Sequence, residues 1–247
     1  MVLISLLTSI LLATAAFAAP SSMRSRRQSR PLQRLQSSGN DTSNVQYSSN
    51  WAGAVWSEAA GTFKAVTGTI TVPTPSSPSG SSSAWVGIDG DTCGNAILQT
   101  GIDMTYENGV VSYDAWYEWY PAVAHDFTGI TIHGGDVLVF TVTATSTTTG
   151  IAKIQNLSNG QTVSKSLSST HALCEQDAEW IVEDYEENGG LVPFCDFGSV
   201  DFTNAFATTS SGSQMTPSGA TEIDIKQNNV VLTSVSESSS GVTITYK

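Results

Sequence analysis

The sequence predicts an all-β protein, an antiparallel β-sandwich or jelly roll. Three observations lead to this prediction. Ser, Thr, Gly, Val and aromatic residues dominate the chain after its N-terminal part, and these residues favour strands and turns over helices. Clusters of Gly, Pro, Asn and Ser, such as the loop 73–80, separate alternating segments at intervals of about ten residues. The one segment that could form a helix, around residues 201–205, is short.

Residues 1–18 have the pattern of a signal peptide. An apolar run over residues 2–12 is followed by Ala16-Phe17-Ala18, which is a small-x-small cleavage site. The run is too short for a stop-transfer helix, and no later stretch approaches about 18 uninterrupted apolar residues. We therefore expect a secreted, extracellular protein with no membrane anchor.

Residues 19–45 have the composition of a basic propeptide. All five arginines of the chain lie between Arg24 and Arg34, and the segment has almost no large apolar residues with which to form a core. Arg26-Arg27 offers a dibasic processing site. The alternative is a disordered basic tail that stays attached to the body of the protein.

The remaining body, residues 46–247, suits a single domain and is strongly acidic. From Val45 onward, five lysines stand against 21 acidic residues, which leaves a formal charge of −16. Such a chain repels itself near neutrality and does so less as its carboxylates protonate towards about pH 3 to 4, so we expect an acid optimum. We also expect this body to contain an acidic cleft that the basic propeptide binds and inhibits at neutral pH. In acid, the carboxylates protonate and this binding should weaken.

Alternation in four segments, 84–89, 96–103, 113–120 and 179–185, separates an apolar face from a polar one. If these strands join one sheet, one side is hydrophobic core and the other a trough lined with carboxylates, an amide and aromatic rings. An ordinary solvent-facing sheet would carry Thr, Ser and Lys there. Large aromatic rings mixed with acids indicate a groove for an extended ligand.

Carboxylate chemistry fits this trough better than other hydrolytic chemistries do. The three histidines, His125, His133 and His171, lie in or beside turns, and no Gly-x-Ser-x-Gly motif occurs. The paired Asp-Thr-Gly or Asp-Ser-Gly turns of aspartic proteases are also absent from the sequence. No His, Cys or Asp cluster has metal-ligand spacing, so we expect no metal and no cofactor.

Five motifs closely resemble the glutamic peptidases, or eqolisins, which are secreted acid endopeptidases of fungi. The motifs follow the family's order over residues 46–247, and the resemblance implies a β-sandwich of two curved seven-stranded antiparallel sheets. They are Ser49-Asn50-Trp51-Ala52-Gly53-Ala54, Ala84-Trp85-Val86-Gly87-Ile88-Asp89-Gly90-Asp91-Thr92-Cys93, Ile97-Leu98-Gln99-Thr100-Gly101, Tyr113-Asp114-Ala115-Trp116-Tyr117-Glu118-Trp119-Tyr120-Pro121 and Ala178-Glu179-Trp180-Ile181-Val182-Glu183-Asp184.

The resemblance implies a catalytic pair, Gln99 and Glu183, and both residues fall on the polar faces defined by alternation. Ionised Glu183 would act as general base on a water that attacks the peptide carbonyl and then pass the proton to the leaving nitrogen. Gln99 would orient the water and donate its amide N–H to the oxyanion, with no covalent intermediate. Such an enzyme is expected to resist pepstatin. The alternative is that both are solvated strand residues.

The resemblance assigns the other trough residues to substrate binding: Trp51, Trp85, Asp89, Asp103, Asp114, Trp116, Glu118 and Tyr120. Any of these aromatic residues could instead lie in the core. Two rival functions use the same trough. One is a jelly-roll glycoside hydrolase with Glu118 and Glu183 as its carboxyl pair, and the other is a non-catalytic carbohydrate-binding lectin.

The three cysteines allow three pairings, and in a secreted chain we expect Cys93 and Cys174 to pair. Cys195 is then a buried, inert thiol, because no histidine or basic residue lies near it in the sequence. Asn156-Leu157-Ser158 predicts N-glycosylation on a surface turn. We expect polypeptide substrates, no nucleic-acid or membrane partner, and a monomer.

Overall fold

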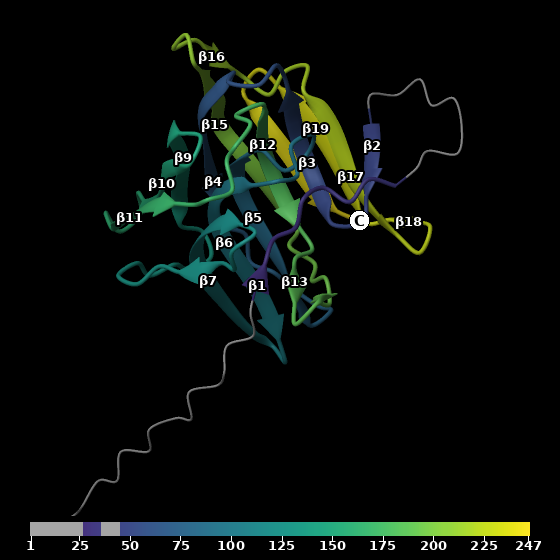
Figure 1. Ribbon diagram of the computed structural model, residues 1–247. Coiled ribbons are helices and arrows are strands. Elements are labelled where there is room, and N and C mark those ends of the chain that lie inside the picture. Colours follow the sequence, from purple (N-terminus) through teal and green to yellow (C-terminus); the bar gives the residue numbers. More distant parts are fainter. Residues whose placement is uncertain (1–26, 36–44) are drawn as a thin grey trace, which may run out of the picture.

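The computed structural model describes residues 27–35 and 45–247, and every regular element in these residues is a β-strand (Figure 1). Two large sheets pack face to face, and a third, small sheet lies beside them. This confirms the predicted all-β sandwich. The expected signal peptide and Arg26 lie outside the described residues. Within them, no helix is long and apolar enough to cross a membrane.

The first large sheet, called the cleft sheet here, has the order β18-β17-β3-β12-β5-β6-β7-β8, with β2 pairing parallel to β17. Its strands are β2 (Val45–Ser48), β3 (Trp51–Ser57), β5 (Gly80–Ile88), β6 (Ile97–Glu107), β7 (Val110–Tyr120), β8 (His125–Asp126), β12 (Asp177–Glu183), β17 (Thr221–Gln227) and β18 (Val230–Val231).

The second, the back sheet, has the order β11-β10-β9-β4-β15-β20-β19, with β16 pairing to β15. Its strands are β4 (Phe63–Thr71), β9 (Val137–Ser146), β10 (Thr149–Asn156), β11 (Thr162–Ser168), β15 (Ser199–Thr209), β16 (Gln214–Met215), β19 (Thr233–Ser238) and β20 (Gly241–Tyr246). The small sheet contains β1 (Arg27–Gln28), β13 (Glu186–Glu187) and β14 (Gly190–Leu191).

Two expectations need correction. The sheets have eight and nine strands among the described residues, not seven each, because short segments such as β2, β8 and β16 extend the main strands. Residues 201–205 are not helical. They lie in β15, which pairs with β4 and β20. The pairing with β4 shifts register after Thr203, and Asn204 there has a φ of 45°. This bulge explains why the segment does not alternate like a regular strand.

The core lies between the sheets and contains the apolar faces that alternation predicted. Ala84, Val86 and Ile88 of β5 are fully buried there, together with Leu98 of β6 and Trp180 of β12. Their neighbours in each strand therefore point to the opposite face of the cleft sheet. That face carries the candidate site.

Candidate active site

Three rows of side chains cross the cleft sheet over β12, β5, β6 and β7, as the strand register dictates. The first row is Glu183, Ser83, Asp103 and Asp114; the second is Ile181, Trp85, Gly101 and Trp116; the third is Glu179, Gly87, Gln99 and Glu118. Gln99 and Glu183 thus lie on one face, on either side of the row that contains Trp85.

Two glycines make room for Trp85. A Cβ at Gly87 would lie 2.7 Å from its ring, and one at Gly101 would lie 2.5 Å from its Cβ. Since neither glycine has a side chain, the indole can reach Glu183, and its Nε1 donates a hydrogen bond to Oε2 at 3.0 Å. The ring of Trp51 packs edge to face on Trp85 at 4.9 Å and completes this support.

Residues 27–35 lie in the cleft, although they belong to the segment expected as propeptide. Figure 1 shows this purple segment leaving β1 beside β13 and passing towards β2. The guanidinium of Arg27 donates to Asp103 at 2.8 Å and to Ser83 at 2.9 Å, and it pairs with Glu118 at 3.3 Å. It also stacks on the ring of Trp116, 3.7 Å from the centroid.

The backbone of this segment contacts the carboxylates directly. The N–H of Ser29 donates to Oε2 of Glu118 at 3.2 Å, and the N–H of Arg30 donates to Oε1 of Glu183 at 3.0 Å. Beyond the centre, Arg34 forms a bidentate pair with Asp91. Three arginines therefore neutralise the acidic cleft, since Arg30 also pairs with Glu186 at 2.9 Å.

Burial governs the charge state of the central acids. It raises the pKa of Glu183 to about 7, although Arg27 and the Arg30 N–H act to lower it. It raises the pKa of Glu118 to about 8 and that of Asp103 to about 6, in both cases against the lowering effect of Arg27. The pKa of Arg27 itself is raised, because its attraction to these acids outweighs the effect of its own burial.

Gln99 makes no hydrogen bond to the described residues through its side chain, although its amide oxygen and nitrogen are both buried. A buried amide has two donors and an acceptor to offer. Oε1 of Glu118, on the neighbouring strand, is likewise buried without a partner in this part of the chain. Within this part of the chain, the amide of Gln99 and Oε1 of Glu118 can therefore still form hydrogen bonds to a ligand.

The structure brings most of the predicted binding residues to this face. Trp51, Trp85 and Trp116 form a buried apolar cluster on it, and Tyr120 packs against the cluster. Asp103 and Glu118 contact Arg27, and Asp114 lies opposite Asp103 on β7.

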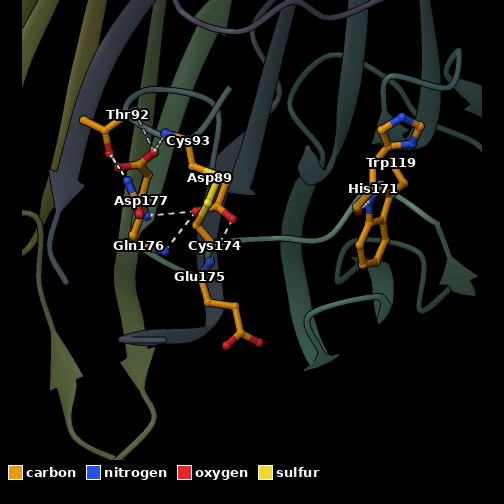
Figure 2. Close-up of a disulfide and its surroundings, with 9 residues drawn as sticks. All are labelled: Asp89, Thr92, Cys93, Trp119, His171, Cys174, Glu175, Gln176 and Asp177. Atoms are coloured by element: carbon orange, nitrogen blue, oxygen red, sulfur yellow. Dashed lines mark hydrogen bonds between the residues drawn. A yellow bond between two sulfur atoms is a disulfide. The ribbon is translucent and has the colours of Figure 1, made fainter. Parts of the chain in front are cut away.

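Asp89 is the exception, because the strand pattern ends before it. Its φ is 70°, and its carboxylate accepts the backbone N–H groups of Glu175, Gln176 and Asp177 at 2.8 to 3.1 Å. Figure 2 shows this clamp beside the disulfide between Cys93 and Cys174, which confirms the predicted pairing. Asp89 therefore fixes a loop and does not line the cleft.

Cys195 is a free, buried thiol, as predicted. The glycan expected on Asn156 does not fit the fold. Asn156 is 1% exposed, and its Nδ2 donates to Thr131 O at 3.0 Å and to Asp136 at 2.8 Å. Among the described residues, one group has metal-ligand side chains close together, but it consists of Asp89 and the two disulfide cysteines.

Sequence reasoning missed Ser83 and Tyr185 as contacts of the central guanidinium, and Asn50 as a contact of the segment backbone. Ser83 lies two residues before Trp85 in β5, so extending the alternation by one step would have found it. No local pattern could identify Leu32, which joins the cleft-side apolar cluster.

The chain is similar in sequence and in fold to known peptidases. A model of the peptidase A4 family matches residues 49–246. Aspergillopepsin-2 of Aspergillus niger is 47% identical over 98% of both chains, and scytalidopepsin B of Scytalidium lignicola is 46% identical over 80% of this chain and 78% of its own. A crystal structure of scytalido-glutamic peptidase with a transition state analog inhibitor matches with a TM-score of 0.75 and 44% identity, and covers 81% of this chain and 98% of that one.

Proposed function

The chain belongs to the peptidase A4 family, the glutamic peptidases, and from this premise we propose that Gln99 and Glu183 are its catalytic pair. Membership makes the protein an endopeptidase, a hydrolase of peptide bonds. One observation carries the proposal. The peptide N–H of Arg30 donates to Oε1 of Glu183 at 3.0 Å, in a cleft that also contains the amide of Gln99, which has no hydrogen-bond partner among the described residues.

The two oxygens of Glu183 have different tasks in this mechanism. Oε2 accepts the indole N–H of Trp85, which holds the carboxylate in place. Oε1 faces the cleft, where it takes a proton from the attacking water and returns it to the leaving nitrogen. The Arg30 nitrogen marks the position of that leaving atom.

Gln99 stabilises the transition state at the carbonyl of the substrate. Its amide N–H donates to the oxygen of the carbonyl as negative charge develops there, and such a donor is worth about 2.7 to 4 kcal/mol in other hydrolases. An amide does not titrate, so this contribution persists in acid. No step requires a bond between enzyme and substrate.

Acidic working conditions follow from the surroundings of Glu183. Burial is the main cause of the raised pKa of Glu183, and the charge of Arg27 and the N–H of Arg30 oppose it. Departure of residues 27–35 admits water to the carboxylate, which lowers its pKa, and removes the contacts of Arg27 and Arg30, which raises it; ionisation in acid requires that hydration outweighs the loss of these contacts.

We also propose that residues 19–45 are an inhibitory propeptide and that the protein is secreted as a monomeric zymogen. The burial of Arg27 supports this, because its guanidinium occupies the cleft beside Asp103 and Glu118, where a substrate would bind. Unfolded or extended polypeptides are the proposed substrates, since residues 27–32 of this chain lie buried or half-buried against the cleft sheet.

The test is cleavage of denatured casein or haemoglobin by the processed protein from about pH 2 to 7, with pepstatin present. Cleavage is expected only in acid, insensitive to pepstatin, and lost in both Glu183→Gln and Gln99→Ala. Cleavage that survives Gln99→Ala would overturn the proposed pair. If wild type instead hydrolysed or bound glycans, and Gln99→Ala left this intact, the carbohydrate alternatives would replace it.

A further inference from the structure

We propose that the cleft contains an apolar subsite for a leucine-sized side chain on the C-terminal side of the cleaved bond. Leu32 occupies it in this chain, as part of a buried apolar cluster with side chains from β3, β5, β6, β7, β12 and β17 of the cleft sheet. The inference rests on the proposed function and adds a sequence preference to it.

The register of the bound segment defines the position of this subsite. The N–H groups of Ser29 and Arg30 donate to Glu118 and Glu183, so the peptide bond that joins these two residues lies against the catalytic carboxylate. Arg30 is then the first residue beyond the reacting bond, and Leu32 is the third.

Leu32 is the buried anchor of the segment beyond the catalytic centre. Its exposed fraction is 9%, whereas Leu35, three residues later, is 40% exposed. Backbone bonds on both sides hold it in place. The N–H of Leu32 donates to Gly90 O at 3.0 Å, and the N–H of Gln33 donates to Oδ1 of Asn50 at 2.9 Å.

The surroundings of Leu32 are apolar although they belong to the polar side of the cleft sheet. Leu32 forms one cluster with aromatic and aliphatic side chains from the body of the protein, all of them buried. They are Trp51, Val55, Trp85, Ile97, Trp116, Ile181 and Ile223. A charged side chain in this cluster would lose most of its hydration.

Gly90, whose carbonyl accepts the N–H of Leu32, packs tightly against two members of this cluster. A Cβ at Gly90 would lie 2.8 Å from the ring of Trp51 and 2.8 Å from Cδ1 of Ile97. The opposite end of the cleft, where Asp103 and Glu118 hold Arg27, has the opposite chemistry.

Burying a leucine side chain in place of a serine should raise kcat/KM by about 10- to 100-fold. The test uses quenched fluorescent peptides with one scissile bond, confirmed by mass spectrometry, and Leu, Ser or Asp at the third residue beyond it. A matched series varies the sixth residue, the position of the exposed Leu35. The processed enzyme should prefer Leu strongly at the third position and show no preference at the sixth.

Two enzyme variants test whether the cluster around Leu32 causes the preference for leucine. Ile223→Ala removes side-chain volume from the cluster that contains Leu32 and should shift the preference from Leu towards Phe, whereas Val230→Ala, at a position 58% exposed on β18, should leave it unchanged. Equal cleavage of the Leu, Ser and Asp peptides by wild type would overturn the subsite while leaving the peptidase intact.

A binding measurement remains informative even if no peptide is cleaved or Ile223→Ala does not fold. Labelled peptides of residues 24–37 are titrated with the processed wild-type protein by fluorescence anisotropy. The change Leu32→Ser should weaken binding by about 10- to 100-fold, and Leu35→Ser should weaken it less than about threefold. Equal effects of the two substitutions would contradict the subsite, whatever the outcome for catalysis.

Discussion

The indole nitrogen of Trp85 lies 3.0 Å from Oε2 of Glu183, and it reaches this position because Gly87 and Gly101 leave the sheet surface beside it bare. Each glycine is thus part of how the carboxylate is oriented. A buried hydrogen bond to an ionised group favours the ionised form, so Trp85 also helps Glu183 to act as a base.

We expect Trp85→Phe to lower kcat by about 10- to 100-fold with little change in KM, because it removes one hydrogen bond to a charged group and keeps the ring. Loss of the donor raises the pKa of Glu183, so the acid limb of the pH profile should move to higher pH. Trp116→Phe is the control, since the indole nitrogen of Trp116 has no partner among the described residues. An unmoved acid limb in Trp85→Phe would contradict this role.

Arg27 predicts how propeptide inhibition depends on pH. Its charge acts to lower the pKa of Asp103, Glu118 and Glu183, so its attraction to them is present when they are ionised and fades as the pH falls through their pKa values, about 6 for Asp103. In a labelled peptide of residues 19–45, Arg27→Gln should raise the dissociation constant from the processed protein, measured by fluorescence anisotropy, by at least about 30-fold near pH 7 and far less near pH 3.

Arg30→Gln is the matched control for this experiment. Arg30 pairs with Glu186 at a partly exposed position, 37% and 24% for the two side chains, where an ion pair contributes only about 0 to 1 kcal/mol. Its loss should change the dissociation constant of the peptide by less than about fivefold. An effect of Arg27→Gln that is the same at both pH values would show that the guanidinium binds by packing on Trp116 and Tyr185 alone.

Local patterns predicted the two faces of the cleft sheet, because each strand alternates over several residues, as Ala84 to Ile88 does. They failed where tertiary structure decides. The pattern could not show that the chain leaves the strand at Asp89, that Asn156 is buried by the loop around Thr131, or that residues 201–205 pair as a strand. Nor does any local pattern reveal that Arg27 docks against Asp103, 76 residues away.

The buried acids predict that the folded protein loses stability as the pH rises. Glu118 and Glu183 have ordinary pKa values of 4.5 and folded values of about 8 and about 7, raised mainly by burial. Between these values the folded chain holds protons that the unfolded chain has released, so the free energy of unfolding falls from about pH 4.5 to 8. Each group contributes at most about 1.4 kcal/mol per pH unit.

Urea unfolding of the precursor at several pH values measures this slope. Glu118→Gln should reduce the slope, since it removes one of the buried titrations. Glu58→Gln, at an exposed position, controls for the loss of a negative charge alone. A free energy of unfolding that stays level or rises between about pH 4.5 and 8 would refute the linkage.

The disulfide Cys93–Cys174 predicts a loss of stability without an immediate loss of activity on reduction. The bond joins residues 81 apart in sequence, and cross-links of native proteins typically contribute about 2 to 5 kcal/mol. The loops stay paired after reduction, because Asp89 binds three N–H groups of residues 175–177 and Asp177 binds the N–H groups of Thr92 and Cys93.

Reduced protein should therefore unfold at lower urea but still cleave casein in buffer, since Gln99 and Glu183 lie within strands β6 and β12. Asp89→Asn should lower the free energy of unfolding more in reduced than in oxidised protein, because after reduction the carboxylate makes the main contact between the two loops. Cys195→Ser controls for the loss of a buried thiol outside the disulfide. If reduction abolished activity before unfolding, the clamp would be too weak to hold the loops, and the disulfide itself would be what keeps β5 and β12 in register near the active site.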